Sequence, residues 1–182
     1  MIKGYLKQLR TAQDKLNPDT IQAAYHVIKA THENNGKLLI CGNGGSAALA
    51  SHMAIDFIKS CDTPIQAISL TDNTAALTAI GNDIGHLDIF AYPLEHLCTP
   101  NDLVIGISTS GASMNIVRAI EVGRQKGAQT LTFTGKAGIR ARRPLHTQAH
   151  IAIIVESVDY GIIEDIHLSI MHSICRQLKK EN

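Results

Sequence analysis

The feature that most constrains the fold is a repeated alternation of short apolar runs with longer, helix-like stretches. Unbroken apolar runs are typical of strands buried on both faces of a sheet, and their alternation with helices is typical of a parallel sheet. The apolar runs lie near residues 37–41, 65–70, 103–108, 130–134 and 151–156, and the helix-like stretches near 46–59, 73–80, 87–97, 113–126 and 162–180. The sequence therefore predicts a doubly wound α/β fold, with helices on both faces of a parallel sheet.

The first 34 residues predict two helices that precede this unit. Asn17-Pro18 interrupts the first apolar pattern, and Pro18 suits the start of a second helix for which Asn17 is the cap. No linker long enough to separate two domains follows. We expect an N-terminal helical extension over residues 1–34 and one ligand-binding domain over residues 35–182.

Composition excludes several broad classes of protein. A chain of 182 residues, 45% of them hydrophobic, is long enough for one complete core. Its formal net charge of +1 argues against a nucleic-acid partner, which needs a basic face. No apolar run is long enough to span a membrane, the N-terminus lacks the apolar segment of a signal peptide, and the four cysteines are widely spaced. We expect a cytoplasmic protein with no nucleic-acid and no membrane partner.

Two loops follow predicted strands and open directly into predicted helices. The first, residues 42–46, is rich in glycine, which lets the backbone turn tightly and approach a ligand. The second, residues 108–113, carries four hydroxyls in six residues. Hydroxyls and backbone N–H groups at a helix N-terminus bind phosphate without a fixed cation. Ligands of open parallel sheets bind at the carboxyl ends of the strands, so both loops predict an anion site there.

Simpler interpretations exist for each loop. The glycine loop fits an ordinary strand–helix turn, and Gly42-x-Gly44-x-x-Ala47 also fits a loose dinucleotide-binding pattern. The serine loop would serve as a capping turn, but capping needs one hydroxyl rather than four. Dinucleotide binding would leave the serine loop unexplained, and the lysine-containing phosphate loop of nucleotide hydrolases is absent. A phosphorylated small molecule therefore suits the two loops best.

Four segments in order resemble the sugar isomerase (SIS) domain family, and within it the phosphoheptose isomerases. They are CGNGGSAALASHMAIDF, SLTDNTAALTAIGNDIGHLDIF, DLVIGISTSGASMNIVRAIEVGRQKGAQTLTFTGK and IIEDIHLSIMHSI. The resemblance implies a five-stranded parallel sheet and a homotetramer with active sites at subunit interfaces. It also implies that residues 35–182 bind a phosphosugar. The substrate contacts it implies are Asn43, Gly44, Gly45, Ser46, Asp56, Asn82, Asp83, Ser108, Thr109, Ser110, Ser113 and Glu164.

The resemblance also implies a zinc site, whose matching residues are His52, Asp56, Glu164 and His172. Asp56 stands where the family has Glu, and Glu164 where it has Gln; both remain oxygen ligands. His52 and Asp56 are spaced i, i+4, on one helix face. Glu164 and His172 are eight residues apart, about 12 Å along one helix, which is too far to share an ion. Either the helix begins after Glu164, or the two serve neighbouring sites across a subunit interface.

The implied reaction is an aldose–ketose isomerisation through an enediol, from sedoheptulose 7-phosphate to D-glycero-D-manno-heptose 7-phosphate, a step toward lipopolysaccharide or another surface glycan. Such a reaction needs a base and an acid. Asp56 is the expected base and His172 the expected partner acid, with Glu164 as the base if Asp56 is committed to the metal.

Two alternatives to this isomerase stay open. One is a non-catalytic regulator or scaffold that keeps the fold and binds phosphosugars. The retention of His52, Asp56 and His172 argues against it. The other is an isomerase for a different phosphosugar, which the departures at Asp56 and Glu164 keep open.

Overall fold

The structure is a computed structural model that describes residues 2–61, 64–140, 142 and 144–180. Within these residues, a parallel sheet of five strands has the order β2-β1-β3-β4-β5. The strands are β1 (Leu38–Gly42), β2 (Ala67–Ser69), β3 (Leu103–Ser108), β4 (Gln129–Gly135) and β5 (Ile151–Val155). The expected five-stranded parallel α/β fold is confirmed. Over the same described residues, no helix combines the length and the apolar character that crossing a membrane requires.

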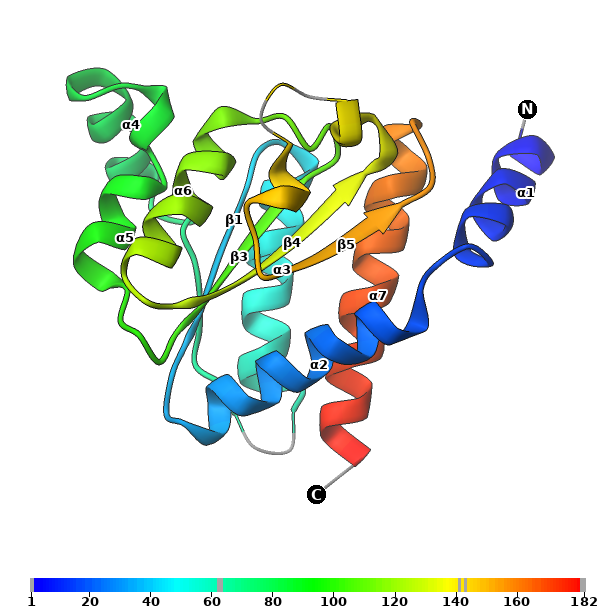
Figure 1. Cartoon of the computed structure of the whole chain (residues 1–182), viewed down its shortest axis with the longest axis horizontal. Helices are drawn as coiled ribbons and strands as arrows, with labels where there is room; N and C mark the ends of the chain where they lie inside the picture. The colour runs from blue at the N-terminus through cyan, green and yellow to red at the C-terminus, as the bar shows by residue number, and fades with distance from the viewer. Residues whose placement is uncertain (1, 62–63, 141, 143, 181–182) are drawn as a thin grey trace.

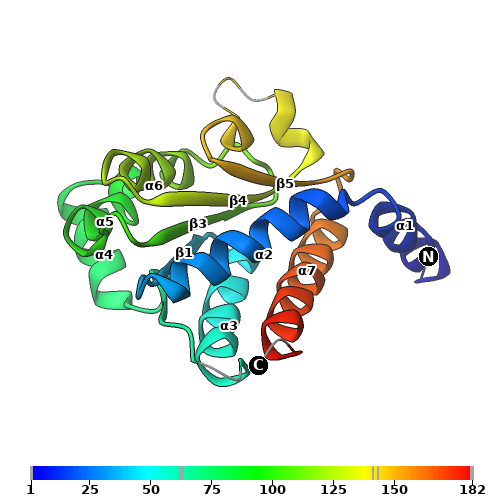
Figure 2. The same ribbon diagram turned by 60° about the horizontal axis from the view of Figure 1, so that its bottom comes forward.

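Helices cover both faces of the sheet, as Figures 1 and 2 show. The helices are α1 (Ile2–Gln13), α2 (Pro18–Glu33), α3 (Gly45–Lys59), α4 (Thr74–Asp83), α5 (Ala91–Leu97), α6 (Met114–Gln125) and α7 (Tyr160–Lys180). Packing of α2, α3 and α7 against one face forms one apolar core, and α5 and α6 pack on the other face over a second. Strands β1, β3 and β4 are buried on both faces, which explains the apolar runs of β1 and β3, whereas β4 buries threonines between its apolar residues.

The N-terminal segment folds as the two expected helices. The Asn17 side chain accepts hydrogen bonds from the backbone N–H groups of Asp19 and Thr20, at 2.9 and 3.2 Å, and so caps α2. Buried Tyr25 and Ile28 place α2 within the core, whereas α1 projects to one side (Figure 1).

The predicted helix over residues 87–97 is divided in the structure. A short 3₁₀ turn, His86–Asp88, comes first, and α5 begins only at Ala91. Pro93 is the third residue of α5, where its missing N–H costs no helical hydrogen bond. A proline there marks the beginning of a helix, so one continuous helix over 87–97 was wrong.

The amino ends of β1 and β3 are joined by a buried carboxylate. Asp102 accepts hydrogen bonds from the backbone N–H and Nζ of Lys37, at 2.9 and 2.6 Å, and from the backbone N–H and hydroxyl of Thr99, at 2.7 and 2.9 Å. Burial alone would raise the pKa of Asp102, but these bonds outweigh it and hold the pKa below its usual value.

Candidate active site

The glycine loop and the serine loop meet at the carboxyl edge of the sheet. Their strands, β1 and β3, are neighbours, and Gly42 pairs in register with Ile107. From β1 the chain first forms β2 on one side and then crosses to form β3 on the other side of β1. The direction of winding therefore reverses between β1 and β3. Open α/β sheets bind ligands at this point.

A cavity of about 290 Å³ lies between the two loops and the first turns of α7. It is lined by Asn43, Gly44, Gly45, Ser46, Ile107, Ser108, Thr109, Ser110, Ser113, Tyr160 and Glu164. Nine of these eleven residues were predicted as substrate contacts; Ile107 and Tyr160 were not. The position of Tyr160 just after β5 is the signal that would have found it. A larger cavity of about 660 Å³, between α1 and the β5–α7 loop, contains none of the predicted site residues.

The glycine loop needs its glycines at two positions for different reasons. Gly44 has φ of +55°, a backbone conformation that side chains disfavour, and it stands at the N-terminus of α3. Gly45 makes room for Glu164: a Cβ there would lie 2.5 Å from the Glu164 carboxylate. The loop thus brings a carboxylate of α7 against the N-terminus of α3.

The serine loop forms a connected set of hydroxyls. Ser108 Oγ lies 3.1 Å from Ser113 Oγ and 3.3 Å from Ser110 Oγ, and Ser110 Oγ accepts from the backbone N–H of Ala112 at 3.3 Å. Ser113 stands at the cap position of α6, yet its side chain makes no capping hydrogen bond. The capping interpretation therefore does not account for this loop. Hydroxyls and a helix N-terminus facing one cavity suit an anion.

Two asparagines join the loops. Asn43 Nδ2 donates to Asn115 Oδ1 at 3.0 Å, and Asn115 Nδ2 donates to Asn43 Oδ1 at 2.9 Å. Asn115 is buried in the first turn of α6, and Asn43 lines the cavity. Sequence reasoning missed Asn115, because its partner lies 72 residues away.

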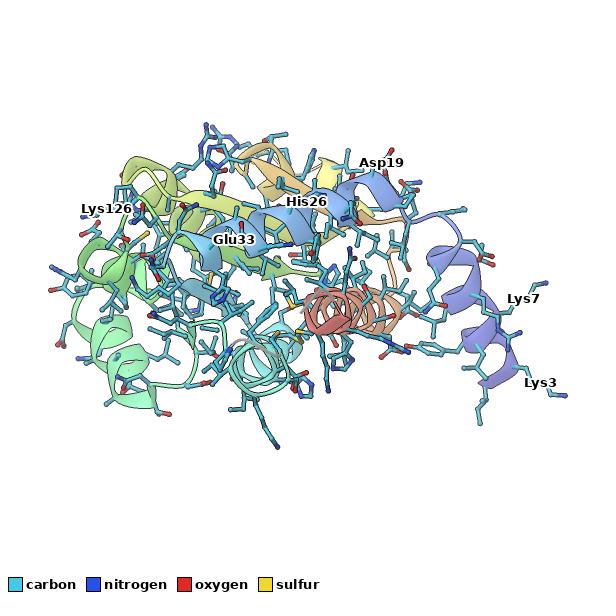
Figure 3. All side chains as sticks on the ribbon, turned by 90° about the horizontal axis from the view of Figure 1, so that it is seen from below. Lys3, Lys7, Asp19, His26, Glu33 and Lys126 are labelled. Carbon is cyan, nitrogen blue, oxygen red and sulfur yellow. The ribbon has the colours of Figure 1, made fainter. Side chains whose placement is uncertain are left out.

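A cluster of three potential metal ligands spans α3 and α7. Nε2 of His52 lies 3.0 Å from Nε2 of His172, and Oδ2 of Asp56 lies 3.2 and 3.4 Å from these two nitrogens. Ligand atoms around a tetrahedral zinc ion are separated by about 3.3 Å. Two imidazoles and a carboxylate at these separations could hold a divalent metal ion. Figure 3 looks along α3 and α7 and shows the two helices side by side.

Glu164 does not join this cluster. It lies with His172 on one continuous helix that begins at Tyr160, so the alternative of a helix starting after Glu164 was wrong. Glu164 lines both the loop cavity and a second cavity, of about 260 Å³, that also contains His52. No hydrogen-bond donor among the described residues engages its carboxylate. Glu164 thus lies between the cavity at the serine loop and the cavity that His52 lines.

The structure places Asn82 and Asp83 apart from these features. They stand exposed at the end of α4, where Asn82 Nδ2 donates to Asp83 Oδ1 at 2.8 Å, and they line neither cavity. Their expected contact with substrate stays a prediction.

Comparison with known proteins agrees with this fold. Residues 3–135 match the family model described as SIS domain. The phosphoheptose isomerase of Helicobacter pylori (strain Shi470) is 40% identical over 185 residues, which cover 96% of this chain and 94% of that protein. That of Aliarcobacter butzleri (strain RM4018) is 37% identical, with coverage of 100% and 96%. A solved phosphoheptose isomerase from Francisella tularensis matches with a TM-score of 0.90 and 30% identity, covering 98% of this chain and 96% of that one.

The first of these matches identifies the class, a SIS domain. The two relatives and the solved structure identify the branch, because they span nearly the whole of both chains. The chain belongs to the phosphoheptose isomerase family.

Proposed function

We propose that this protein is an aldose–ketose isomerase that converts sedoheptulose 7-phosphate to D-glycero-D-manno-heptose 7-phosphate. One observation carries the proposal: a single cavity contains both a hydroxyl-rich anion cradle and a carboxylate, Glu164, with no hydrogen-bond donor of the described chain on it. The names of the relatives in the same family support the choice of substrate. The product would feed the synthesis of lipopolysaccharide or another surface glycan.

The serine loop would bind the phosphate. Ser108, Ser110 and Ser113 offer hydroxyl donors, and the N-terminus of α6 adds unpaired backbone N–H groups. Because the phosphate is remote from C1 and C2, its binding energy would align the reacting carbons without taking part in the chemistry.

His52, Asp56 and His172 would hold a divalent metal ion, zinc in our proposal, since two imidazoles and a carboxylate are the ligands it takes in catalytic sites. A bound ion would polarise the substrate carbonyl and stabilise negative charge on its oxygen.

Proton transfer between C1 and C2 would fall to Glu164. Oδ2 of Asp56 lies within 3.4 Å of Nε2 of both histidines, so this oxygen would be held in the histidine cluster. Glu164 faces the cavity, and none of the described residues makes such a contact with it, which favours Glu164 over Asp56 as the base. His172 would be a ligand rather than the partner acid in this arrangement.

We further propose a homotetramer with active sites at subunit interfaces, in the cytoplasm. The side chains of His52 and His172 are about half exposed, at 49% and 47%. Large apolar residues are also exposed on α3, the helix of His52, among them Ile55 and Ile58. Asn82 and Asp83, which miss the cavity of their own chain, would reach the site of a neighbouring subunit. Residues 35–182 would form the phosphosugar-binding unit and residues 1–34 an extension whose second helix completes the core.

The test is turnover of sedoheptulose 7-phosphate by zinc-reconstituted protein. We expect Glu164→Gln to lower kcat by about 10²- to 10⁴-fold with zinc content unchanged. Asp56→Asn should lose zinc as well as activity, measured by elemental analysis. Glu33→Gln, the same change at an exposed site on α2, is the control and should match the wild type.

Full activity of Glu164→Gln would contradict its role as the base. A folded wild type that binds phosphosugars without turnover would instead indicate a regulator or another substrate. Light scattering would test the tetramer.

A further inference from the structure

We propose that Asn115 is a positioning residue that fixes the orientation of the Asn43 carboxamide toward the sugar part of the ligand. This inference rests on the proposed function, because it assigns the walls of the same cavity to different parts of a phosphosugar. Asn115 itself is 2% exposed and does not line the cavity, so it would act through Asn43.

The two amides could both be rotated by 180°, exchanging oxygen and nitrogen, and still form two mutual hydrogen bonds. A backbone N–H group selects one of these two orientations. The N–H of Ile116 donates to Asn115 Oδ1 at 3.0 Å, besides its bond to the carbonyl of Ser113 at 3.0 Å. A rotated Asn115 would point its amino group at this donor, and two donors repel. Asn115 is therefore held with oxygen toward Ile116, and Asn43 must present Nδ2 to that oxygen.

A count of hydrogen-bonding capacity shows what remains for a ligand. A carboxamide has two N–H donors and two acceptor positions on oxygen. The pair uses one of each on Asn43, at 3.0 and 2.9 Å. Asn43, which lines the cavity, therefore keeps one donor and one acceptor, on opposite sides of its amide group.

A free donor and a free acceptor on opposite sides of one amide fit the several hydroxyl groups of a sugar, each of which both accepts and donates. They fit a phosphate dianion poorly, because phosphate oxygens only accept. The serine loop offers the complementary set, hydroxyl donors and a helix N-terminus. The cavity thus has a side at the serine loop that suits phosphate and a side at Asn43 that suits sugar hydroxyls. The hydrogen bonds between Asn43 and Asn115 fix the orientation of the Asn43 amide relative to the serine loop.

The test separates sugar recognition from phosphate recognition. Asn115→Asp keeps the shape and the acceptor but replaces the donor to Asn43 with a second acceptor; Asn115→Leu removes the polar group and is the second variant if the first is unstable. Asn73→Asp makes the same chemical change at the cap of α4, away from both cavities, and is the control. Calorimetry measures the affinity of each full-length protein for inorganic phosphate and for sedoheptulose 7-phosphate, and thermal unfolding measures stability.

We expect both Asn115 variants to keep the wild-type affinity for inorganic phosphate within about twofold and to lose about 10-fold or more for the sugar phosphate. Their kcat should fall by about 10- to 100-fold, since misplacement by an ångström has an effect of this size. Asn43→Ala should cost far less in the Asn115→Asp background than in the wild type, because the two residues act as one unit.

Two results would overturn the proposal. One is a parallel loss of both affinities together with the melting temperature, which would indicate a purely structural role for Asn115. The other is an equal cost of Asn43→Ala in both backgrounds, which would show that the residues act independently. If the wild type binds the sugar phosphate without isomerising it, the proposed reaction fails, while the ratio of the two affinities still decides the role of Asn115.

Discussion

The two edges of the sheet use polar groups in opposite ways. At the amino edge, the Asp102 carboxylate is buried and accepts four hydrogen bonds from Lys37 and Thr99. At the carboxyl edge, the Glu164 carboxylate faces a cavity, and none of the described residues donates a hydrogen bond to it. A saturated carboxylate stabilises the fold but has no capacity left for a ligand. An unsaturated one contributes little to stability and is available for chemistry. We therefore expect substitutions at the two edges to separate stability from activity.

The largest effect on stability at neutral pH should come from the amino edge. Asp102→Ala removes the partner of Lys37 and of two groups of Thr99, and should lower the free energy of unfolding by about 3 kcal/mol, measured by urea denaturation. Activity per folded molecule should not change.

The control is Glu156→Gln, which breaks the ion pair between Glu156 and Lys136. This pair has the same N–O distance as the pair between Lys37 and Asp102, 2.6 Å, but lies on the surface. The unfolding midpoint should hardly move, because water screens an exposed pair. If both substitutions lowered the free energy of unfolding equally, burial of Asp102 would not explain its contribution to stability.

A group at neither edge gives a pH-dependent effect. His167 is buried among apolar residues beside Phe133, and desolvation lowers its pKa to about 4 from 6.5, with the backbone of Thr134 opposing this weakly. Above pH 6.5 the ring is neutral in both the folded and the unfolded chain. Between pH 6.5 and 4 only the unfolded chain binds the proton, so stability should fall as the pH is lowered.

The total loss through His167 should reach about 3 kcal/mol near pH 4. Denaturation at a series of pH values measures it, and His167→Gln should flatten the profile in this window. An unchanged profile in that variant would assign the acid sensitivity to other groups.

The smallest expected effect on stability belongs to the carboxyl edge. Gly45→Ala places a methyl group 2.5 Å from the position of the Glu164 carboxylate, which must move away. We expect kcat/KM to fall by about 10- to 100-fold while the melting temperature stays the same, since the carboxylate ends a flexible side chain.

Gly4→Ala is the matched control, because a Cβ at Gly4 meets nothing within 4 Å. It should keep full activity and slightly stabilise α1. A comparable loss of activity in both variants would mean that the contact with Glu164 is not the cause.

Much of the fold follows from local sequence patterns. Short apolar or threonine-containing runs identified all five strands, and the pattern is clearest in β1 and β3, which are buried on both faces. Asn17 and Pro18 identified the start of α2 through their own chemistry. The division of the stretch 87–97 was missed, because the apolar pattern there continues across the point where Pro93 sets the start of α5.

The candidate site was predictable where single loops carry it. Both loops that line the cavity were found from their composition and their place after strands. The spatial relation of Glu164 to Gly45, and of Asn43 to Asn115, was not, because each depends on how elements far apart in the chain pack. Helical spacing predicted that Glu164 and His172 lie too far apart on one helix to share an ion, and the structure shows that α7 is one continuous helix.

The long last helix has a consequence for redesign. Residues 3–135, which match the shared family model, include both anion-binding loops, whereas Tyr160, Glu164 and His172 all lie on α7. The serine loop, proposed to bind the phosphate, and Glu164, the proposed base, are thus encoded in separate stretches of the chain, although two of the proposed metal ligands, His52 and Asp56, lie on α3. A library confined to α7 would therefore vary Tyr160, Glu164 and His172 while the serine loop stays unchanged. Selection for activity on new sugar phosphates could begin with such a library.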